Sequence, residues 1–191
     1  MKIAVMSDIH GNIYALMKTL EDIDEQRVDK IICLGDLVGY GPHPNEVIAL
    51  IRRREIPCIR GNYDASVVDG DFTFIRNTAI NSFALPWTCE EVRVSNKYYL
   101  ASLPTSLKYT FNGINILFTH GSPNAINEYL FEDAENTKKV MTEYEGDVLV
   151  CAHTHIPFTK KFNNKTLINV GSVGKPKIGK PNPTYTIIEI K

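Results

Sequence analysis

The strongest constraint on the fold is an alternation of short apolar runs with amphipathic segments over residues 2–59. The apolar runs, which predict β-strands, span residues 2–7, 30–34 and 56–59. The amphipathic segments between them predict two helices, the first capped by Asn12 and the second opened by Pro44. Strand, helix, strand, helix, strand with connections this short indicates a parallel α/β sheet with right-handed crossovers.

The second half of the chain has a different pattern. Pairs of apolar runs flank Asn-Gly at 112–113 and Asn-Asn at 163–164, which predicts two β-hairpins. The other predicted elements are helices and loops over 64–103, a helix around 128–144, a buried strand at 148–152 and a strand at 185–190. We therefore expect an α/β fold in which two sheets pack together with helices outside, as one domain over residues 1–191.

The composition excludes several classes of protein. Twenty-one basic side chains against 22 acidic ones leave a net charge of −1, so no overall field attracts nucleic acid or a membrane surface. No run approaches the roughly 18 apolar residues of a membrane span, and the first residues lack the pattern of a signal peptide. The four cysteines have no CxxC spacing, and three lie in apolar runs, where thiols pack as small core residues. We expect a cytoplasmic protein without disulfides, and without membrane or nucleic-acid partners.

Candidate metal ligands follow the ends of five predicted strands. They are Asp8, His10, Asp36, Asn62, His120, His153 and His155. The carboxyl ends of strands in an α/β sheet converge on one crevice, and side chains two apart on an extended segment point to the same side. Imidazole with oxygen donors and no thiolate suits Mn, Fe, Ni or Zn at a reactive site. Seven ligands are too many for one tetrahedral ion and suit two ions that share a carboxylate.

Five motifs around these residues resemble those of the calcineurin-like metallophosphoesterases, and in particular their small bacterial and archaeal members. In chain order the motifs are DIH (8–10), GDLVG (35–39), GNYD (61–64), TH (119–120) and HTH (153–155). The segment NVGSVGKP (169–176) resembles the closing Gly-Ser segment of the family. The resemblance implies a four-layer αββα sandwich of two mixed sheets, and a metal-dependent phosphoric ester hydrolase. It also implies two divalent ions, with Mn as the first choice and Ni, Fe, Zn or Mg as alternatives.

The resemblance further implies roles for single residues. Asp8, His10 and His155 would hold one ion, Asn62, His120 and His153 the other, and Asp36 would bridge the two. Asn62 would also orient the substrate phosphate. Family members often have a histidine after this asparagine, as a proton donor to the leaving group, whereas this chain has Tyr63. A phenol with a pKa near 10 is a poorer acid at neutral pH, and His43 is either a substitute donor at the substrate or a surface-loop residue. Asp64 is a candidate to orient the Tyr63 segment.

We predict a phosphodiesterase that hydrolyses a small phosphate ester through a metal-bridging hydroxide and favours good leaving groups. One alternative is a hydrolase of dinucleoside polyphosphates or cyclic nucleotides, and another is a non-catalytic scaffold that reuses the fold. A protein phosphatase is disfavoured, because GDLVGYGPHP lacks the arginine that follows the second motif in such enzymes. The natural substrate, the physiological metal and the formation of a homo-oligomer do not follow from the sequence.

Two further groups of residues each have two interpretations. A stretch without acids contains Lys160, Lys161, Lys165, Lys175, Lys177 and Lys180. It is either a solvated surface, which we favour, or a rim that attracts phosphate. For the aromatic residues Phe72, Phe74, Phe83 and Trp87 we favour core packing over a lid that stacks on a base.

Overall fold

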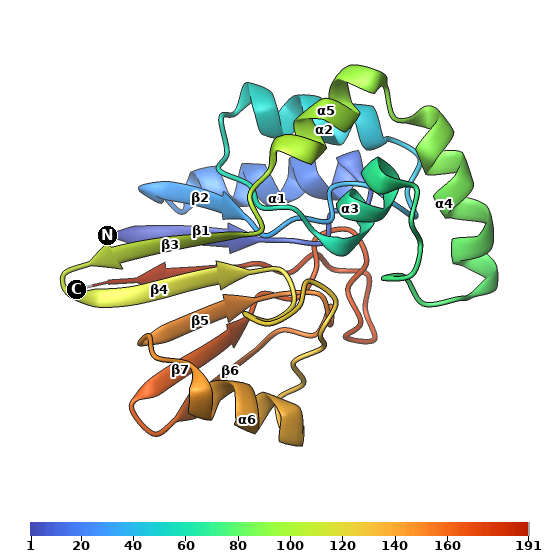
Figure 1. Cartoon of the computed structure of the whole chain (residues 1–191). Helices are drawn as coiled ribbons and strands as arrows, with labels where there is room; N and C mark the ends of the chain where they lie inside the picture. Colours follow the sequence, from blue (N-terminus) through green and yellow to red (C-terminus); the bar gives the residue numbers. More distant parts are fainter. Residues whose placement is uncertain (191) are drawn as a thin grey trace.

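Two mixed β-sheets pack against each other in the computed structural model, which describes residues 1–190 (Figure 1). The smaller sheet has the order β2-β1-β8, with β1 at Lys2–Met6, β2 at Lys30–Cys33 and β8 at Thr186–Glu189. The larger sheet has the order β3-β4-β5-β7-β6. Its strands are β3 Ser106–Phe111, β4 Ile114–Thr119, β5 Val148–Cys151, β6 Phe158–Phe162 and β7 Lys165–Asn169. Each sheet combines parallel and antiparallel pairs, as predicted.

The helices cover the outer faces of the two sheets (Figure 1). On the side of the smaller sheet lie α1 Ile13–Glu25, α2 Pro44–Arg53, α3 Asn62–Asp69, α4 Ala79–Glu91 and α5 Val94–Ser102. Helix α6, Glu135–Glu143, packs on the larger sheet. The result is the expected order of helix, sheet, sheet and helix layers. None of the helices in residues 1–190 has the length and apolarity needed to span a bilayer.

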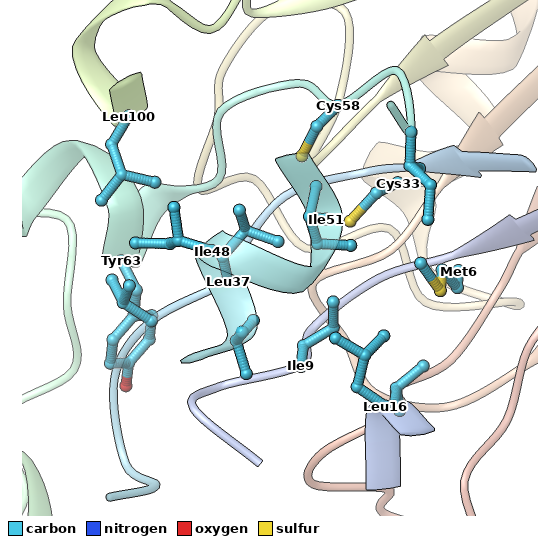
Figure 2. Close-up of a cluster of buried hydrophobic side chains, with 14 of the residues drawn as sticks. Met6, Ile9, Leu16, Cys33, Leu37, Ile48, Ile51, Cys58, Tyr63 and Leu100 are labelled. Carbon is cyan, nitrogen blue, oxygen red and sulfur yellow. The ribbon is translucent and has the colours of Figure 1, made fainter. Parts of the chain in front are cut away.

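Side-chain alternation along the strands divides the core into layers. In β1, Ile3 and Val5 point into the apolar layer between the sheets, while Ala4 and Met6 point towards the helices. Figure 2 shows part of the helix-facing layer, including Met6, Cys33 of β2 and Ile48 of α2. With both faces of the smaller sheet covered, its parallel strands β1 and β2 end in a region that is shielded from solvent.

Local signals in the sequence place most of the elements correctly. The Asn12 side chain accepts a hydrogen bond from the Ala15 N–H at the start of α1, and Pro44 begins α2. The two hairpins form around residues 112–113 and 163–164. Of the four cysteines, Cys33, Cys58 and Cys151 are buried, as core thiols should be.

Three expectations are wrong. Residues 56–59 make one bridge, Cys33 to Cys58, because the segment continues into the Gly61 turn before a ladder can form. Helix α6 begins only at Glu135, since the main chain before it is held by side chains, such as Asn136 on the Tyr129 carbonyl. The third is the assignment of the aromatic residues to the core: Phe72, Phe74 and Phe83 are exposed and Trp87 is half-buried. Phe83 and Trp87 lie on α4, whose buried side consists of Asn81, Ala84, Leu85 and Thr88, and Phe72 and Phe74 lie in the segment between α3 and α4.

The layer between the sheets supplies a stability prediction. Phe118 on β4 is fully buried there, so Phe118→Ala is expected to lower the free energy of unfolding by about 3–5 kcal/mol through lost burial and a residual cavity. Phe83→Ala is the matched control, since 77% of that side chain is exposed, and it should change the value by less than about 0.5 kcal/mol. Urea denaturation of both variants measures the difference, and equal losses would contradict this description of the core.

Candidate metal centre

The seven side chains proposed as ligands from the sequence lie together at one end of the two sheets. Asp8 and His10 follow β1, Asp36 follows β2, Asn62 begins α3, His120 follows β4, and His153 and His155 follow β5. Two groups form among them, Asp8 with His10 and His155, and Asp36 with His120 and His153. Within each group the donor atoms lie within 4.8 Å of one another, and all six residues are buried.

The first group directs three lone pairs at one point. The Nδ1 atom of His10 donates to the Val38 carbonyl at 3.0 Å, and that of His155 donates to the Lys175 carbonyl at 2.6 Å. In a neutral imidazole the Nε2 atom then carries a lone pair, and the two Nε2 atoms are only 3.3 Å apart. Asp8 Oδ1 lies 3.1 Å from His155 Nε2 and has no hydrogen-bond donor. Two imidazole nitrogens and a carboxylate oxygen that lie within 4.8 Å of one another fit a bound cation.

The second group contains a histidine with acceptors on both sides of its ring. His120 Nδ1 donates to the Leu34 carbonyl at 2.8 Å, and Nε2 donates to Asn62 Oδ1 at 2.9 Å. Burial alone would lower the pKa of His120, but the charges of Asp36 and Asp8 raise it to about 10. His120 is therefore an imidazolium at neutral pH, with its Nε2 proton where a metal ion would bind.

His153 is held in the opposite charge state. Burial, followed by the positive charge of His120, lowers the pKa of His153 to about 4, so its ring is neutral. Its Nε2 atom donates to the Asn127 carbonyl at 3.1 Å, which leaves Nδ1 with a free lone pair. The ring stacks on Tyr129 with the centroids 4.0 Å apart. His153 is thus oriented from two sides by the loop that precedes α6.

Asp36 lies between the two groups. Its Oδ1 atom accepts a hydrogen bond from the Tyr63 N–H at 2.8 Å. Its Oδ2 atom has no hydrogen-bond donor and lies 3.7 Å from His10 Nε2 and 3.4 Å from His120 Nε2. A carboxylate with one anchored oxygen and one oxygen facing both groups fits a ligand shared by two ions.

Both carboxylates are ionised. Burial would raise the pKa of Asp8, but His155, His10 and His120 hold the pKa well below its usual range. Burial likewise opposes the ionisation of Asp36, and the neighbouring His120 and His10 nevertheless lower its pKa. The site therefore carries two negative charges, which divalent cations would neutralise.

The backbone at these residues is strained. Asp8, His10, Asp36, His153 and His155 have φ angles between 50° and 64°, in the left-handed region that few residues other than glycine adopt. Gly61 is also restricted, because a Cβ atom there would lie 2.1 Å from Asp36 Oδ1. Such strain persists only where the surrounding structure enforces it, and it is concentrated at functional sites.

Asp64 ties two of the loops together. Its Oδ1 atom accepts hydrogen bonds from the N–H groups of Leu37 and Val38 at 2.9 and 3.3 Å, and its Oδ2 atom accepts one from Gly61 at 3.0 Å. Burial and the charge of Asp36 raise the pKa of Asp64 to about 7. Asp64 thus orients the segment of Tyr63, as proposed from the sequence, and the loop of Asp36 as well.

Tyr63 and His43, the candidate proton donors, differ in their environments. The Tyr63 hydroxyl donates to Asn81 Oδ1 at 2.9 Å and contacts the Tyr40 hydroxyl, while its ring edge packs on His10. Burial and the Tyr40 contact raise the pKa of Tyr63 above its usual range. Figure 2 shows its hydroxyl pointing away from the apolar core. His43 precedes α2 and packs on Tyr14, in a cavity of about 280 Å³ that also reaches His10.

Sequence reasoning missed several residues of the site. A cavity of about 260 Å³ lies over Asp36 and Asn62, and its lining includes Arg76 and Tyr129, which no motif had indicated.

The lysines of the stretch without acids fall into two groups, those that line this cavity and those that do not. Lys175 and Lys177 line this cavity, whereas Lys160 pairs with Asp133, Lys165 binds the carbonyls of Met141 and Thr142, and Lys161 and Lys180 are exposed. Two signals in the sequence included these site lysines: the stretch without acids, for which a rim that attracts phosphate was the less favoured interpretation, and their position in and just after NVGSVGKP.

Comparison with known proteins identifies the same family along the whole chain. The calcineurin-like phosphoesterase superfamily domain matches residues 1–191. An uncharacterised protein of Methanocaldococcus jannaschii is 35% identical over 206 residues, which cover 99% of this chain and 83% of that protein. The phosphodiesterase YfcE of Escherichia coli K12 is 27% identical, over 95% of this chain and 84% of its own. The crystal structure of a metallophosphoesterase from Sphaerobacter thermophilus has a TM-score of 0.82 at 29% identity, over 99% of this chain and 83% of that one.

Metal binding at neutral pH should release a proton from His120. The metal-free protein holds this proton because the pKa is about 10, and a ligand must give it up. We expect about one proton released per chain at pH 7, and an apparent affinity for Mn²⁺ that rises with pH, by at most about tenfold per unit below pH 10. Calorimetric titration in two buffers of different protonation enthalpy counts the protons. Identical enthalpies in both buffers would contradict the assignment.

Proposed function

The chain belongs to the calcineurin-like phosphoesterase superfamily, and we propose that it is a phosphodiesterase that binds two divalent metal ions and hydrolyses a small phosphate ester. One observation carries this proposal. Two groups of buried donors lie beside an open cavity, each with one carboxylate oxygen that accepts no hydrogen bond, and Asp36 of the second group also faces His10 of the first. Buried charges without partners are destabilising, so this arrangement is explained by cations that complete it.

The proposed ligands fall into two sets. Asp8, His10 and His155 would hold one ion, Asn62, His120 and His153 would hold the other, and Asp36 would contribute to both. Nitrogen and oxygen donors without thiolate suit Mn²⁺, with Fe, Ni and Zn as alternatives. When bound, two such ions supply a water of lowered pKa and a positive clamp for phosphoryl oxygens.

In the proposed mechanism, side chains of the protein position the substrate. The Asn62 side chain lies in the cavity lining, with its Nδ2 atom donating to the Phe74 carbonyl at 3.2 Å and its Oδ1 atom facing His120. We propose that the amide orients the phosphate. Tyr63 acts as a positioning residue, since its ring supports His10 and its N–H anchors Asp36.

The proposed mechanism lacks a strong acid for the leaving group. The proton of Tyr63 is held by Asn81 in a buried position, and its pKa is raised rather than lowered. His43 lines a different cavity from that of Asn62. We therefore propose a preference for esters whose leaving groups depart as anions without protonation, such as aryl phosphodiesters.

The sequence left a non-catalytic scaffold as the rival function, and the site does not favour it. A scaffold has no need of ionised carboxylates held without partners or of left-handed backbone at five ligand positions. Both features cost stability and would be lost readily without a function that requires them.

The role of Asp36 can be tested directly. Asp36→Asn should leave the fold intact and lower kcat/KM for bis(4-nitrophenyl) phosphate at least about 100-fold, because a neutral amide is a poor bridge between two cations. Bound metal should also fall below two ions per chain. Asp69→Asn, at the exposed end of α3, is the matched control and should behave like the wild type. Metal analysis and circular dichroism accompany the assay, and an Asp36→Asn variant with two ions and full activity would refute the proposal.

The source of the leaving-group proton can be read from a series of aryl methyl phosphates. Without an acid catalyst, log kcat should fall steeply as the pKa of the leaving phenol rises, and Tyr63→Phe should not change this slope. A shallow wild-type slope that steepens in Tyr63→Phe would instead make Tyr63 the donor. The same change in His43→Asn would assign the proton to His43.

A further inference from the structure

Three cationic side chains line the same cavity as the proposed metal ligands. They are Arg76, from the loop before α4, and Lys175 and Lys177, from the segment before β8. Asp36 is the one acid among the residues that line this cavity, and it is a proposed ligand of both ions. The cavity is therefore strongly positive on a protein whose net charge is only −1.

None of these three cations has a carboxylate within ion-pair distance in the described part of the chain. Other basic side chains do have such a partner, as Lys160 has in Asp133 and Arg54 has in Asp24. Three like charges thus line one cavity, and none of them is neutralised by a direct ion pair with a described residue.

The lysine segment is attached to a proposed metal ligand. The Lys177 N–H donates to the His155 carbonyl at 3.0 Å, and His155 Nδ1 donates to the Lys175 carbonyl at 2.6 Å. The Lys175 ammonium lies 3.3 Å from the centroid of the Tyr40 ring, a cation–π contact at the edge of the site. The positions of both lysines relative to the centre are therefore set by main-chain hydrogen bonds.

The loop that carries Arg76 is also held by hydrogen bonds, which reach its main chain from two asparagine side chains. The Phe74 carbonyl accepts from Asn62 Nδ2 at 3.2 Å, and the Arg76 carbonyl accepts from Asn81 Nδ2 at 2.7 Å. Asn81 is itself bound by the Tyr63 hydroxyl. Two residues of the GNYD motif thus fix the place of Arg76 at the cavity.

The positive charge of these three side chains is more than is needed to bind the reacting phosphate. Two divalent ions and Asn62 already provide for the single negative charge of a phosphodiester. Like charges that line one cavity repel one another, and an anion that binds among them relieves this repulsion. Arg and Lys are the residues that bind phosphate oxygens. We propose that Arg76, Lys175 and Lys177 form a subsite for a second phosphate. The substrate is then a phosphodiester with a further phosphate on one arm, an inference that rests on the proposed phosphodiesterase function.

Two synthetic esters that differ only in this group provide the test. They are 4-nitrophenyl ethyl phosphate and 4-nitrophenyl 2-phosphonoethyl phosphate, which release the same phenol. The wild-type protein loaded with Mn²⁺ should have a kcat/KM at least about tenfold higher for the phosphonate ester, mainly through KM, and the ratio should shrink as salt is added. Arg76→Gln and Lys177→Gln should each reduce the ratio about fivefold, as expected for one partly exposed charge contact.

Lys161→Gln is the matched control, because Lys161 lies exposed on β6 and does not line the cavity. It should keep the wild-type ratio. Equal kcat/KM values for the two esters, or a ratio unchanged in both Arg76→Gln and Lys177→Gln, would overturn the subsite while leaving the phosphodiesterase function in place.

A protein that holds two ions but hydrolyses neither ester would refute the proposed function instead. Calorimetric titration with the phosphonate ester then decides the subsite separately. Binding that weakens about fivefold in Arg76→Gln and Lys177→Gln, but not in Lys161→Gln, would support the subsite. Binding that is absent, or equal in all variants, would overturn it.

Discussion

The carboxylates of Asp8 and Asp36 are fully buried, and each has one oxygen without a hydrogen-bond donor. Two uncompensated charges in a protein interior are destabilising by several kcal/mol, so the surrounding chain must hold them in place. The neighbouring histidines provide part of the compensation. His120 keeps a proton between Asp36 and Asn62, and the neighbouring His155 and His10 help to hold the pKa of Asp8 well below its usual range. Divalent cations would provide the rest.

The loops at this end of the sheets are built around that requirement. Five of the proposed ligands adopt left-handed backbone, and Gly61 leaves room for Asp36 where a Cβ atom would clash. Asp64 binds N–H groups of two loops at once, which fixes the distance between the Asp36 loop and the start of α3. The apolar layers on both sides of the smaller sheet supply the rigid support that such strain needs.

The same hydrogen bonds that orient the ligands extend outward to the cavity. Asn62 holds the Phe74 carbonyl, and His155 is paired with the main chain of Lys175 and Lys177. The metal centre and the cationic lining are therefore one connected structure. This connection supports the proposal that substrate recognition and chemistry take place in the same 260 Å³ cavity. The fold by itself specifies neither the substrate nor the reaction.

Local patterns in the sequence were sufficient for the helices and hairpins with clear periodicity, for the two-sheet architecture and for the seven side chains that meet at the strand ends. These features depend on neighbours in the chain, such as the Asn12 cap, the Asn-Gly turn and the position of each polar residue after a strand. The exposure of Phe74, the late start of α6 and the place of Arg76 at the cavity did not follow from these patterns. Arg76 illustrates the reason. Its loop is hydrogen-bonded to Asn62 and Asn81, but these bonds place it at the site only because Asn62 faces His120, which follows β4 of the other sheet and lies 58 residues away in the sequence.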